Sequence, residues 1–283
     1  MVLRAAVKKN SQGFTLIESI TVIVVLAILA ALGGSFVVSS TDSYRTTQAR
    51  SKLVNTGRQA IERMTRQLRI ALPYSVRLTN GNMCVEFMPI VSGGTYRGRL
   101  DAASNSYTEY VPDLVNGATA TTTLTVAPHT IDFGTPQFVS IGAMRAAELY
   151  GATPTSLATL TSRTSTQINF APARGWSRNS LSKRFYLLDA PQAFCVVGNQ
   201  LRFYSNQSAT ANDVDVSSPF SLLAENVTAA TPFLLTAGSE NRNTVVQFNI
   251  NFEVRIRVRI GANAGSGTES IAFNNSVMIR NVP

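Results

Sequence analysis

The sequence has few of the side chains that most enzymes use for chemistry. Its 283 residues include one histidine, two cysteines and one tryptophan, and charged residues make up only 14%. Because His129 is the only histidine, the sequence offers few of the residues that a histidine-based triad or a zinc site requires. The acidic residues are scattered, so a paired-carboxylate hydrolase is not indicated, and no phosphate-binding loop or nucleophile motif is present. The composition therefore predicts a protein that is not an enzyme, with no catalytic residues, no cofactor and no metal.

A long apolar run near the N-terminus stands out against the rest of the chain. It covers 25 residues, from Phe14 to Val38, and Glu18 is its only ionisable side chain. A helix of this length rises roughly 38 Å at 1.5 Å per residue, which is enough to cross a bilayer. The leader before it carries three basic residues and no acid. This bias predicts a single-pass protein with a cytoplasmic N-terminus and a periplasmic C-terminal domain.

An ordinary secretory signal peptide is the alternative for this segment. It also has a basic start and an apolar stretch, and small residues between Ala27 and Leu32 offer a later cleavage site. Such a signal has no need of Glu18, because a carboxylate inside the bilayer costs about 2.5–3.5 kcal/mol. An acid within a membrane helix is by default a functional residue with a partner. The sequence therefore favours a segment that does more than direct export.

The stretch Gly13-Phe14-Thr15-Leu16-Ile17-Glu18 resembles the class III signal of type IV prepilins and type II secretion pseudopilins. The resemblance implies that prepilin peptidase cleaves after Gly13 and methylates the new N-terminus at Phe14. It also implies that Glu18 aligns the subunit against the N-terminal amine of a neighbour. The partners implied are prepilin peptidase, other minor pilins, the major pilin, the inner-membrane assembly platform and membrane lipid.

Three later stretches resemble the MshO-type minor pilins of mannose-sensitive haemagglutinin pili. They cover residues 84–97, 184–195 and 279–283. These pilins are similar in turn to J-type minor pseudopilins and W-type minor pilins. The resemblance implies a minor pilin that primes assembly at the tip of a type IV pilus, first in the bacterial inner membrane and then at the cell surface. Two alternatives stay open: a tip adhesin that binds a surface or glycan, and a minor pseudopilin of a type II secretion system.

The pattern of apolar residues predicts a long N-terminal helix followed by strands, which is an α+β chain. The resemblance implies the type IV pilin fold, in which this helix packs on an antiparallel β-sheet domain. The predicted segments are a cytoplasmic leader, a membrane and fibre-core helix, an amphipathic helix and a β-rich periplasmic domain, at 1–13, 14–41, 42–72 and 73–283. Within the last, residues 91–183 are predicted to form a large β-rich insertion or second lobe. Gly33 and Gly34 offer a point of local unwinding in the first helix.

The amphipathic helix is predicted from an apolar stripe with three- and four-residue spacing, and Pro73 ends it. The stripe consists of Leu53, Gly57, Ala60, Ile61, Met64 and Leu68. The net charge of the chain is +9, and the helix holds much of it. Residues 42–70 carry seven cations and two acids, whereas residues 71–283 carry fifteen cations and thirteen acids. The distal domain is thus nearly neutral, and nothing in it demands a nucleic-acid partner.

Strands are predicted from period-two alternation beyond Pro73. The predicted strands are 84–90, 137–141, 167–170, 185–188, a hairpin over 194–204 with its turn at Gly198-Asn199, 248–260 and 270–279; a helical turn is predicted over 144–150. The strand over 248–260 is the clearest, because apolar residues alternate with polar ones along its whole length. Its polar face includes Arg255, Arg257 and Arg259, which a nucleic acid or another anion could contact, although a solvated face is more typical.

Three further sets of residues have two interpretations each. Cys84 and Cys195 predict one disulfide in an exported chain, with free thiols or a metal site as alternatives. Asp213 and Asp215 form either a calcium-binding loop or, more typically, a solvated acidic turn. Trp176 is either an exposed binding anchor or a core residue.

Overall fold

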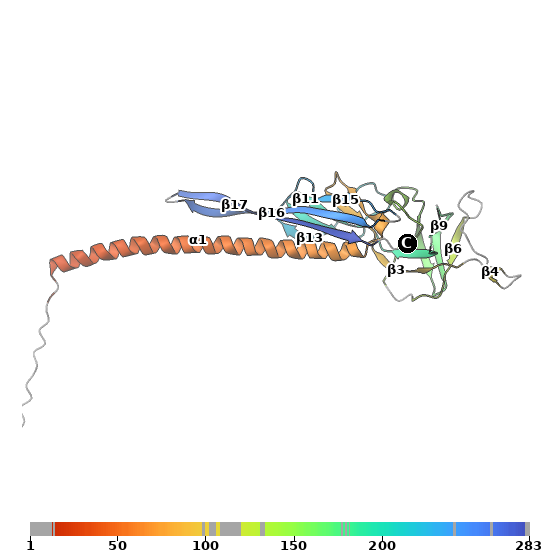
Figure 1. The fold of residues 1–283 in the computed structure, drawn as a ribbon, viewed down its shortest axis with the longest axis horizontal. Coiled ribbons are helices and arrows are strands. Elements are labelled where there is room, and N and C mark those ends of the chain that lie inside the picture. Colours follow the sequence, from red (N-terminus) through yellow and green to blue (C-terminus); the bar gives the residue numbers. More distant parts are fainter. Residues whose placement is uncertain are drawn as a thin grey trace, which may run out of the picture. The chain divides into compact units, whose positions relative to one another are not determined.

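The computed structural model of the chain has one long helix followed by antiparallel sheets, which confirms the predicted α+β fold (Figure 1). The chain divides into two units, Met1–Ser51 with Arg255–Glu269, and Lys52–Val254 with Ser270–Pro283. Each unit is considered by itself below. The structure describes residues 13, 15–97, 100–101, 106–107, 120–130, 134–176, 178, 180, 182–239, 242–260 and 263–280.

Helix α1 (Leu16–Arg69) is continuous over 54 residues and therefore joins the two helical segments expected from the sequence. Gly33 and Gly34 lie within it without unwinding it, and no atom outside the helix backbone would touch a Cβ at either position. The helix ends at Arg69, and a short 3₁₀ turn (Pro73–Ser75) follows. Proline fixes its own φ and lacks an N–H, so it cannot continue the α-helix.

The second half of α1 packs on the β domain through the apolar stripe predicted from the sequence. Its buried residues are Leu53, Gly57, Ala60, Ile61, Met64 and Leu68. All except Gly57 belong to one hydrophobic core with the sheets described next. Gly57 lies directly against the ring of Phe273, and a Cβ at this position would overlap the ring. The absence of a side chain is therefore what lets the helix approach the sheet so closely.

The first sheet has five antiparallel strands in the order β1-β2-β11-β12-β13. Their bounds are Arg77–Thr79, Cys84–Phe87, Gln192–Val197, Gln200–Tyr204 and Phe220–Glu225. The hairpin of β11 and β12 confirms the predicted one, and Gly198 has the positive φ of 61° that its turn requires. One face of the sheet, with Phe87, Phe194 and Phe203, belongs to the hydrophobic core shared with the helix.

Four C-terminal strands form a second sheet, in which β16 pairs with β14, β15 and β17. The strands are β14 (Val227–Thr228), β15 (Phe233–Thr236), β16 (Thr244–Ile260) and β17 (Asn263–Ile279). Both long strands were predicted, over 248–260 and 270–279, and each begins earlier than predicted, at Thr244 and Asn263. Phe248, Ile250 and Phe252 are fully buried in the shared core, as their period-two spacing predicts.

A third sheet comes from the middle of the chain, in the order β3-β10-β7-β8-β9-β6. The strands are β3 (Ile90–Thr95), β6 (Thr121–Thr125), β7 (Phe138–Ile141), β8 (Leu157–Arg163), β9 (Gln167–Arg174) and β10 (Arg184–Leu188). Its two edges meet, because Tyr96 pairs with Val126 in an antiparallel bridge just beyond β3 and β6. The Arg97 N–H donates to the Thr125 carbonyl at 2.8 Å, and the Ala127 N–H donates to the Thr95 carbonyl at 2.8 Å. The sheet therefore closes into a six-stranded antiparallel barrel.

The barrel has its own core, distinct from that under α1. Its buried residues come from all six strands or their ends and include Phe170, Trp176, Phe185 and Leu187. Two short elements accompany the barrel: a two-stranded pair, β4 (Leu100–Asp101) with β5 (Ser106–Tyr107), and a 3₁₀ turn at Ala146–Glu148.

The strand predicted over 84–90 is wrong in one respect, since it is two strands in two sheets. β2 ends at Phe87 and β3 begins at Ile90, and Pro89 lies between them. Proline cannot donate to a sheet ladder, so the chain leaves the first sheet here and enters the barrel. A third cluster, with Leu72, Met88, Leu149 and Leu188, packs at this junction.

We expect Gly57→Ala to lower the thermal stability of the full chain in detergent. A methyl group there must displace the Phe273 ring, which costs about 1–3 kcal/mol, more than the roughly 1 kcal/mol that alanine adds to helix propensity. Gly34→Ala is the matched control, because its Cβ meets nothing within 4 Å. Equal melting temperatures for the two variants would contradict the close helix–sheet contact.

Candidate functional site

The first turn of α1 carries the residues that the sequence singled out. Thr15 precedes the helix, and its hydroxyl oxygen accepts a hydrogen bond from the Glu18 N–H at 3.3 Å. The Thr15 carbonyl also accepts from the N–H groups of Glu18 and Ser19, each at 3.1 Å. Thr15 is thus the N-cap and Glu18 the third helical residue, which is the spacing of a capping box.

Glu18 lies exposed in this first turn. A carboxylate at this position offsets the partial positive charge at the helix N-terminus. Gly13 is exposed too, and a Cβ there would meet no atom within 4 Å. Phe14, the predicted methylation site, lies outside the described residues, so cleavage after Gly13 and methylation of Phe14 remain predictions.

The first half of α1 exposes an apolar surface that nothing else in the described chain covers. Large side chains from Leu16 to Val38 are each between 36% and 79% exposed, with Leu16 the highest and Phe36 at 72%. By length and composition this is the one described helix that could cross a membrane. Left in water, so much apolar area would cost about 25 cal/mol per Å². The segment therefore requires hydrocarbon or other apolar helices around it.

Three hydroxyl groups in the first half of α1 donate hydrogen bonds to carbonyls of the helix itself. Thr21 donates to the Glu18 carbonyl at 2.9 Å, Ser35 to the Leu32 carbonyl at 2.8 Å, and Thr41 to the Val37 carbonyl at 2.8 Å. Such bonds lower the cost of placing these three hydroxyl groups in a bilayer. Glu18 is the one charged side chain between Leu16 and Val38, and its carboxylate has no hydrogen bond or ion pair among the described residues.

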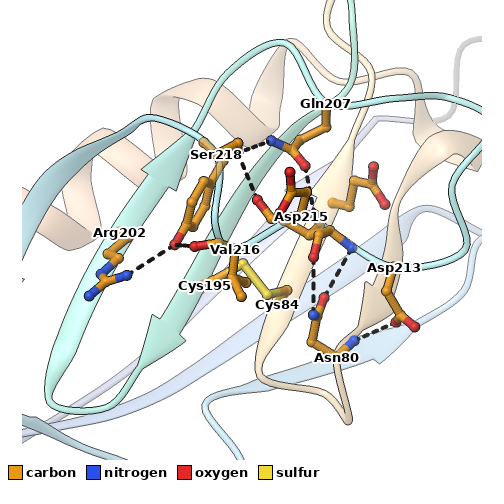
Figure 2. The surroundings of a disulfide bond; sticks show 12 residues. Asn80, Cys84, Cys195, Arg202, Gln207, Asp213, Asp215, Val216 and Ser218 are labelled. Atoms are coloured by element: carbon orange, nitrogen blue, oxygen red, sulfur yellow. Dashed lines mark hydrogen bonds between the residues drawn. A yellow bond between two sulfur atoms is a disulfide. The ribbon is translucent and has the colours of Figure 1, made fainter.

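Cys84 and Cys195 form a disulfide, which confirms the predicted pairing (Figure 2). They lie directly opposite each other on β2 and β11. Both are buried, on the sheet face that points away from the α1 core, where Tyr204 and Val214 pack around them. The bridge links residues 111 apart in sequence.

A loop between β12 and β13 covers the disulfide. Asn80 fixes it with a reciprocal pair of bonds, donating to the Val214 carbonyl and accepting from the Val214 N–H, both at 3.1 Å (Figure 2). The Tyr204 hydroxyl donates to the Val216 carbonyl at 3.1 Å. Gln207 closes the loop by accepting from the Asp215 N–H at 2.9 Å and donating to Ser218 at 2.8 Å. The loop therefore shields the bridge from solvent.

The position of the disulfide relates it to the barrel. β2 leads into β3, the first barrel strand, and β10, which is also in the barrel, leads into β11. Because β2 and β11 are neighbours in the first sheet, the barrel is an insertion between two paired strands. The disulfide joins those two strands and so closes the base of the insertion.

A buried ion pair near the disulfide was not predicted from the sequence. Arg77 Nε lies 2.7 Å from Glu86 Oε2, and Glu86 is only 1% exposed. The Arg77 guanidinium also stacks 3.8 Å from the ring centroid of Tyr150 and donates to the Ala211 carbonyl at 2.8 Å. Burial raises the pKa of Glu86 even though Arg77 acts against it. Arg77 thus links the first sheet to Tyr150, which follows the 3₁₀ turn at Ala146–Glu148, and to Ala211 in the loop that covers the disulfide.

A second unpredicted ion pair lies beside the barrel. Arg178 binds Glu148 through two bonds, at 2.7 and 3.0 Å, and the Met144 N–H adds a third at 3.0 Å. Burial by itself would raise the pKa of Glu148, but the bonds from Arg178 and Met144 and the charges of Arg178 and Arg145 outweigh it. They hold the pKa below its usual value. Nothing in the spacing of these residues along the sequence signals that they meet.

The remaining candidates have structural surroundings. Trp176 is 1% exposed and packs edge-to-face on Phe170 with centroids 5.3 Å apart, so the exposed-anchor interpretation is wrong and the core interpretation is confirmed. Asp213 accepts from the Asn80 N–H and Asp215 from the Ser217 N–H, each at 2.9 Å, as in an acidic turn. His129 lies 3.0 Å from the Ser165 carbonyl.

No group of three metal-binding side chains occurs among the described residues. Arg255 is exposed on β16, whereas the side chains of Arg257 and Arg259 lie outside the described part of the structure. The arrangement thus concentrates its distinctive features at the start of α1 and at the disulfide.

Comparison with protein families gives one match, to the prokaryotic N-terminal methylation motif, over residues 8–34. These residues include Gly13, Phe14 and Glu18 and the start of the apolar half of α1. The match supports a type IV pilin-like protein, and the motif implies processing by prepilin peptidase and assembly with other pilins. No curated protein and no solved structure matches the chain.

We expect Cys84→Ala/Cys195→Ala to lower the free energy of unfolding by about 2–4 kcal/mol, because the unfolded chain loses its cross-link. The measurement is denaturant unfolding of the full chain, with and without reductant. Reductant should destabilise the wild type toward the variant and leave the variant unchanged. A wild type as unstable as the variant before reduction would contradict the stabilising role.

Proposed function

We propose that this chain is a minor pilin of a type IV pilus, of the MshO type, and that it primes pilus assembly at the tip. The observation that carries the proposal is the methylation motif placed at the start of a long apolar helix. A basic leader, a cleavable glycine and an apolar helix with one early carboxylate are the parts such a subunit needs. The periplasmic location of the β domain is proposed with it, and the disulfide supports an oxidising compartment.

Cleavage after Gly13 is compatible with the local geometry. Gly13 is exposed and lies outside the helix, so a peptidase can reach it without unwinding α1. The Thr15 cap lies on the far side of the proposed cut and stays intact. Cleavage would therefore create the new amine at Phe14, two residues before Leu16, the first residue of α1.

That amine gives Glu18 a role. A positive charge beside a helix N-terminus is unfavourable, because the macrodipole is positive there as well. The carboxylate of Glu18 in the first turn offsets the charge of the amine and the positive end of the macrodipole. In hydrocarbon this carboxylate also requires a cationic partner. We propose that in the assembly this cation is the N-terminal amine of a neighbouring subunit.

The minor and MshO-type assignments rest on the later part of the chain. The stretches 84–97 and 184–195, which carry the resemblance, contain β2-β3 and β10-β11, the two crossings between the first sheet and the barrel. A minor pseudopilin of a type II secretion system would have the same N-terminus, and the resemblance of these stretches favours the pilus. The barrel has its own core and makes the subunit large. A large subunit suits the end of a pilus better than a position that repeats along it.

The mass of the mature N-terminus tests the proposal directly. Purified from membranes of cells with prepilin peptidase, the chain should begin at Phe14 and carry one added methyl group. Gly13→Ala should leave the leader attached, because the resemblance assigns the cut to that glycine. A mature chain that starts near residue 31 would show an ordinary signal peptide and overturn the proposal.

We expect Glu18→Ala to reduce co-purification with other pilin subunits from membranes by at least about tenfold, because an unpaired amine in hydrocarbon costs about 2.5 kcal/mol or more and about 1.4 kcal/mol already corresponds to tenfold. Glu18→Gln should reduce recovery of the complex nearly as much, because the amide has the shape of the carboxylate but not its charge. Ser19→Ala, in the same exposed turn, is the control. Unchanged recovery of the complex with Glu18→Ala would rule out this role.

A further inference from the structure

The outward face of the second half of α1 is strongly basic. We call it the basic face and define it as Lys52, Arg58, Glu62, Arg66 and Arg69. All five are exposed, and they lie opposite the stripe that packs on the sheets. Four cations and one acid occupy this face, whereas residues 71–283 carry fifteen cations and thirteen acids in total. The basic face thus carries a net charge of +3 along one side of one helix, which is more than the +2 of residues 71–283 together.

Little in the described structure neutralises these cations. Glu62 lies 3.9 Å from Arg66, and both side chains are about 70% exposed, so this pair is worth less than about 1 kcal/mol. Lys52, Arg58 and Arg69 have no ion pair among the described residues. Arg63 is different, because its guanidinium lies 5.2 Å from the ring centroid of Phe203 and so belongs to the packed side.

We propose that the basic face docks an acidic helix of a different pilin-like subunit. This rests on the proposed function and adds the chemistry of the neighbour to it. The face is a straight strip along one helix, which suits a second helix laid beside it. Complementary charge along such a strip sets which partner binds and in which register.

A second copy of this chain does not fit the same face. Helices pack about 8–10 Å apart, which is no more than the Debye length at 0.1 M salt. Each pair of like charges at that distance costs about 0.4 kcal/mol even in water, and four cations would face four. The face therefore disfavours a homopolymer and selects a heterotypic neighbour.

Glu62 distinguishes a protein partner from a phosphate surface. It lies in the middle of the face, with two cations before it and two after it. A nucleic acid or an anionic membrane surface has a net negative potential, which is unfavourable for this carboxylate. An acidic helix can place one cation opposite Glu62 and acids opposite the rest.

The first test is charge reversal in the full chain, in membranes that contain the other pilin subunits. Arg66→Glu/Arg69→Glu should lower recovery of the heterotypic complex about tenfold at low salt, and high salt should reduce the difference. Arg255→Glu/Arg280→Glu is the control, since it makes the same charge change at exposed arginines outside α1. Arg66 and Arg69 lie in the last turn of α1, where positive charge stabilises the helix, so their reversal costs about 1 kcal/mol of stability. Recovery in both arms is therefore measured at a temperature well below the melting temperature of every variant.

The second test identifies the neighbour with a photocrosslinking residue at Gln59, which is exposed between Arg58 and Glu62. The expected product is another pilin-like subunit, joined through a helix with net negative charge. Changing two of its acids to lysine should then restore the complex with Arg66→Glu/Arg69→Glu. Crosslinks only to a second copy of this chain, only to lipid, or to no protein would overturn the proposal.

The two proposals fail in different ways. If the wild-type chain recovers no pilin-like subunit at all, the proposed function fails and this inference with it. If the wild type and Glu18→Ala behave as expected but charge reversal changes nothing, the function stands and only the basic-face proposal is overturned.

Discussion

The burial of one face of α1 is the interaction on which the rest of the structure depends. Between Leu53 and Leu68 the helix contributes to the largest hydrophobic core, together with residues of the first and C-terminal sheets. Gly57 sets the depth of this contact, because the Phe273 ring occupies the space that a side chain would need. The same helix continues toward the N-terminus with an apolar surface that has no partner in the described chain. One secondary-structure element therefore has to satisfy two environments, protein on one half and hydrocarbon or other helices on the other.

The topology of the β domain lets the chain carry a large insertion without disturbing that contact. The barrel leaves and re-enters the first sheet at two neighbouring strands, and it buries a core of its own. Its ends are held by backbone pairing of β2 with β11, by the Cys84–Cys195 bridge and by the Arg77–Glu86 pair. The Arg77–Glu86 pair is weak evidence for stability, because burying both charges is costly. It does restrict how the first sheet can pack against its neighbours, because both charges must remain paired. The restraints all lie at the junction, so the packing of α1 does not depend on the barrel wall.

The parts that could be predicted from the sequence are those governed by local periodicity. All six apolar residues expected on the packed face of α1 are buried, because a helix repeats every 3.6 residues whatever lies beside it. Phe248, Ile250 and Phe252 are buried for the analogous reason in a strand. The disulfide was predictable because the chain has only two cysteines. Of the N-terminal residues, Glu18 could be singled out because a carboxylate is costly in an apolar run.

What escaped prediction depends on contacts between residues far apart in sequence. The closure of the barrel depends on a bridge between Tyr96 and Val126, and neither flank has a clear alternating pattern. The ion pairs at Glu86 and Glu148 depend on the register of the strands and the path of the loops. Neither can be determined from the number of charged residues in the sequence. Trp176 shows the limit of composition most clearly. Tryptophan next to arginines is typical of a binding anchor, but here it is buried in the core of the barrel. No local pattern in the sequence predicts that barrel.

The distribution of charge connects these levels. A packed face needs apolar residues and a membrane segment excludes charge, so neither can hold the net charge of the chain. The excess is therefore left to the outward side of α1, beyond the apolar run and away from the core. Solubility alone would be served equally well by cations spread over the sheets, whose own charges nearly balance. The cations are instead concentrated on α1, the helix that continues the membrane segment. In an assembly of pilin-like helices, α1 is the element that would lie closest to the neighbouring subunits.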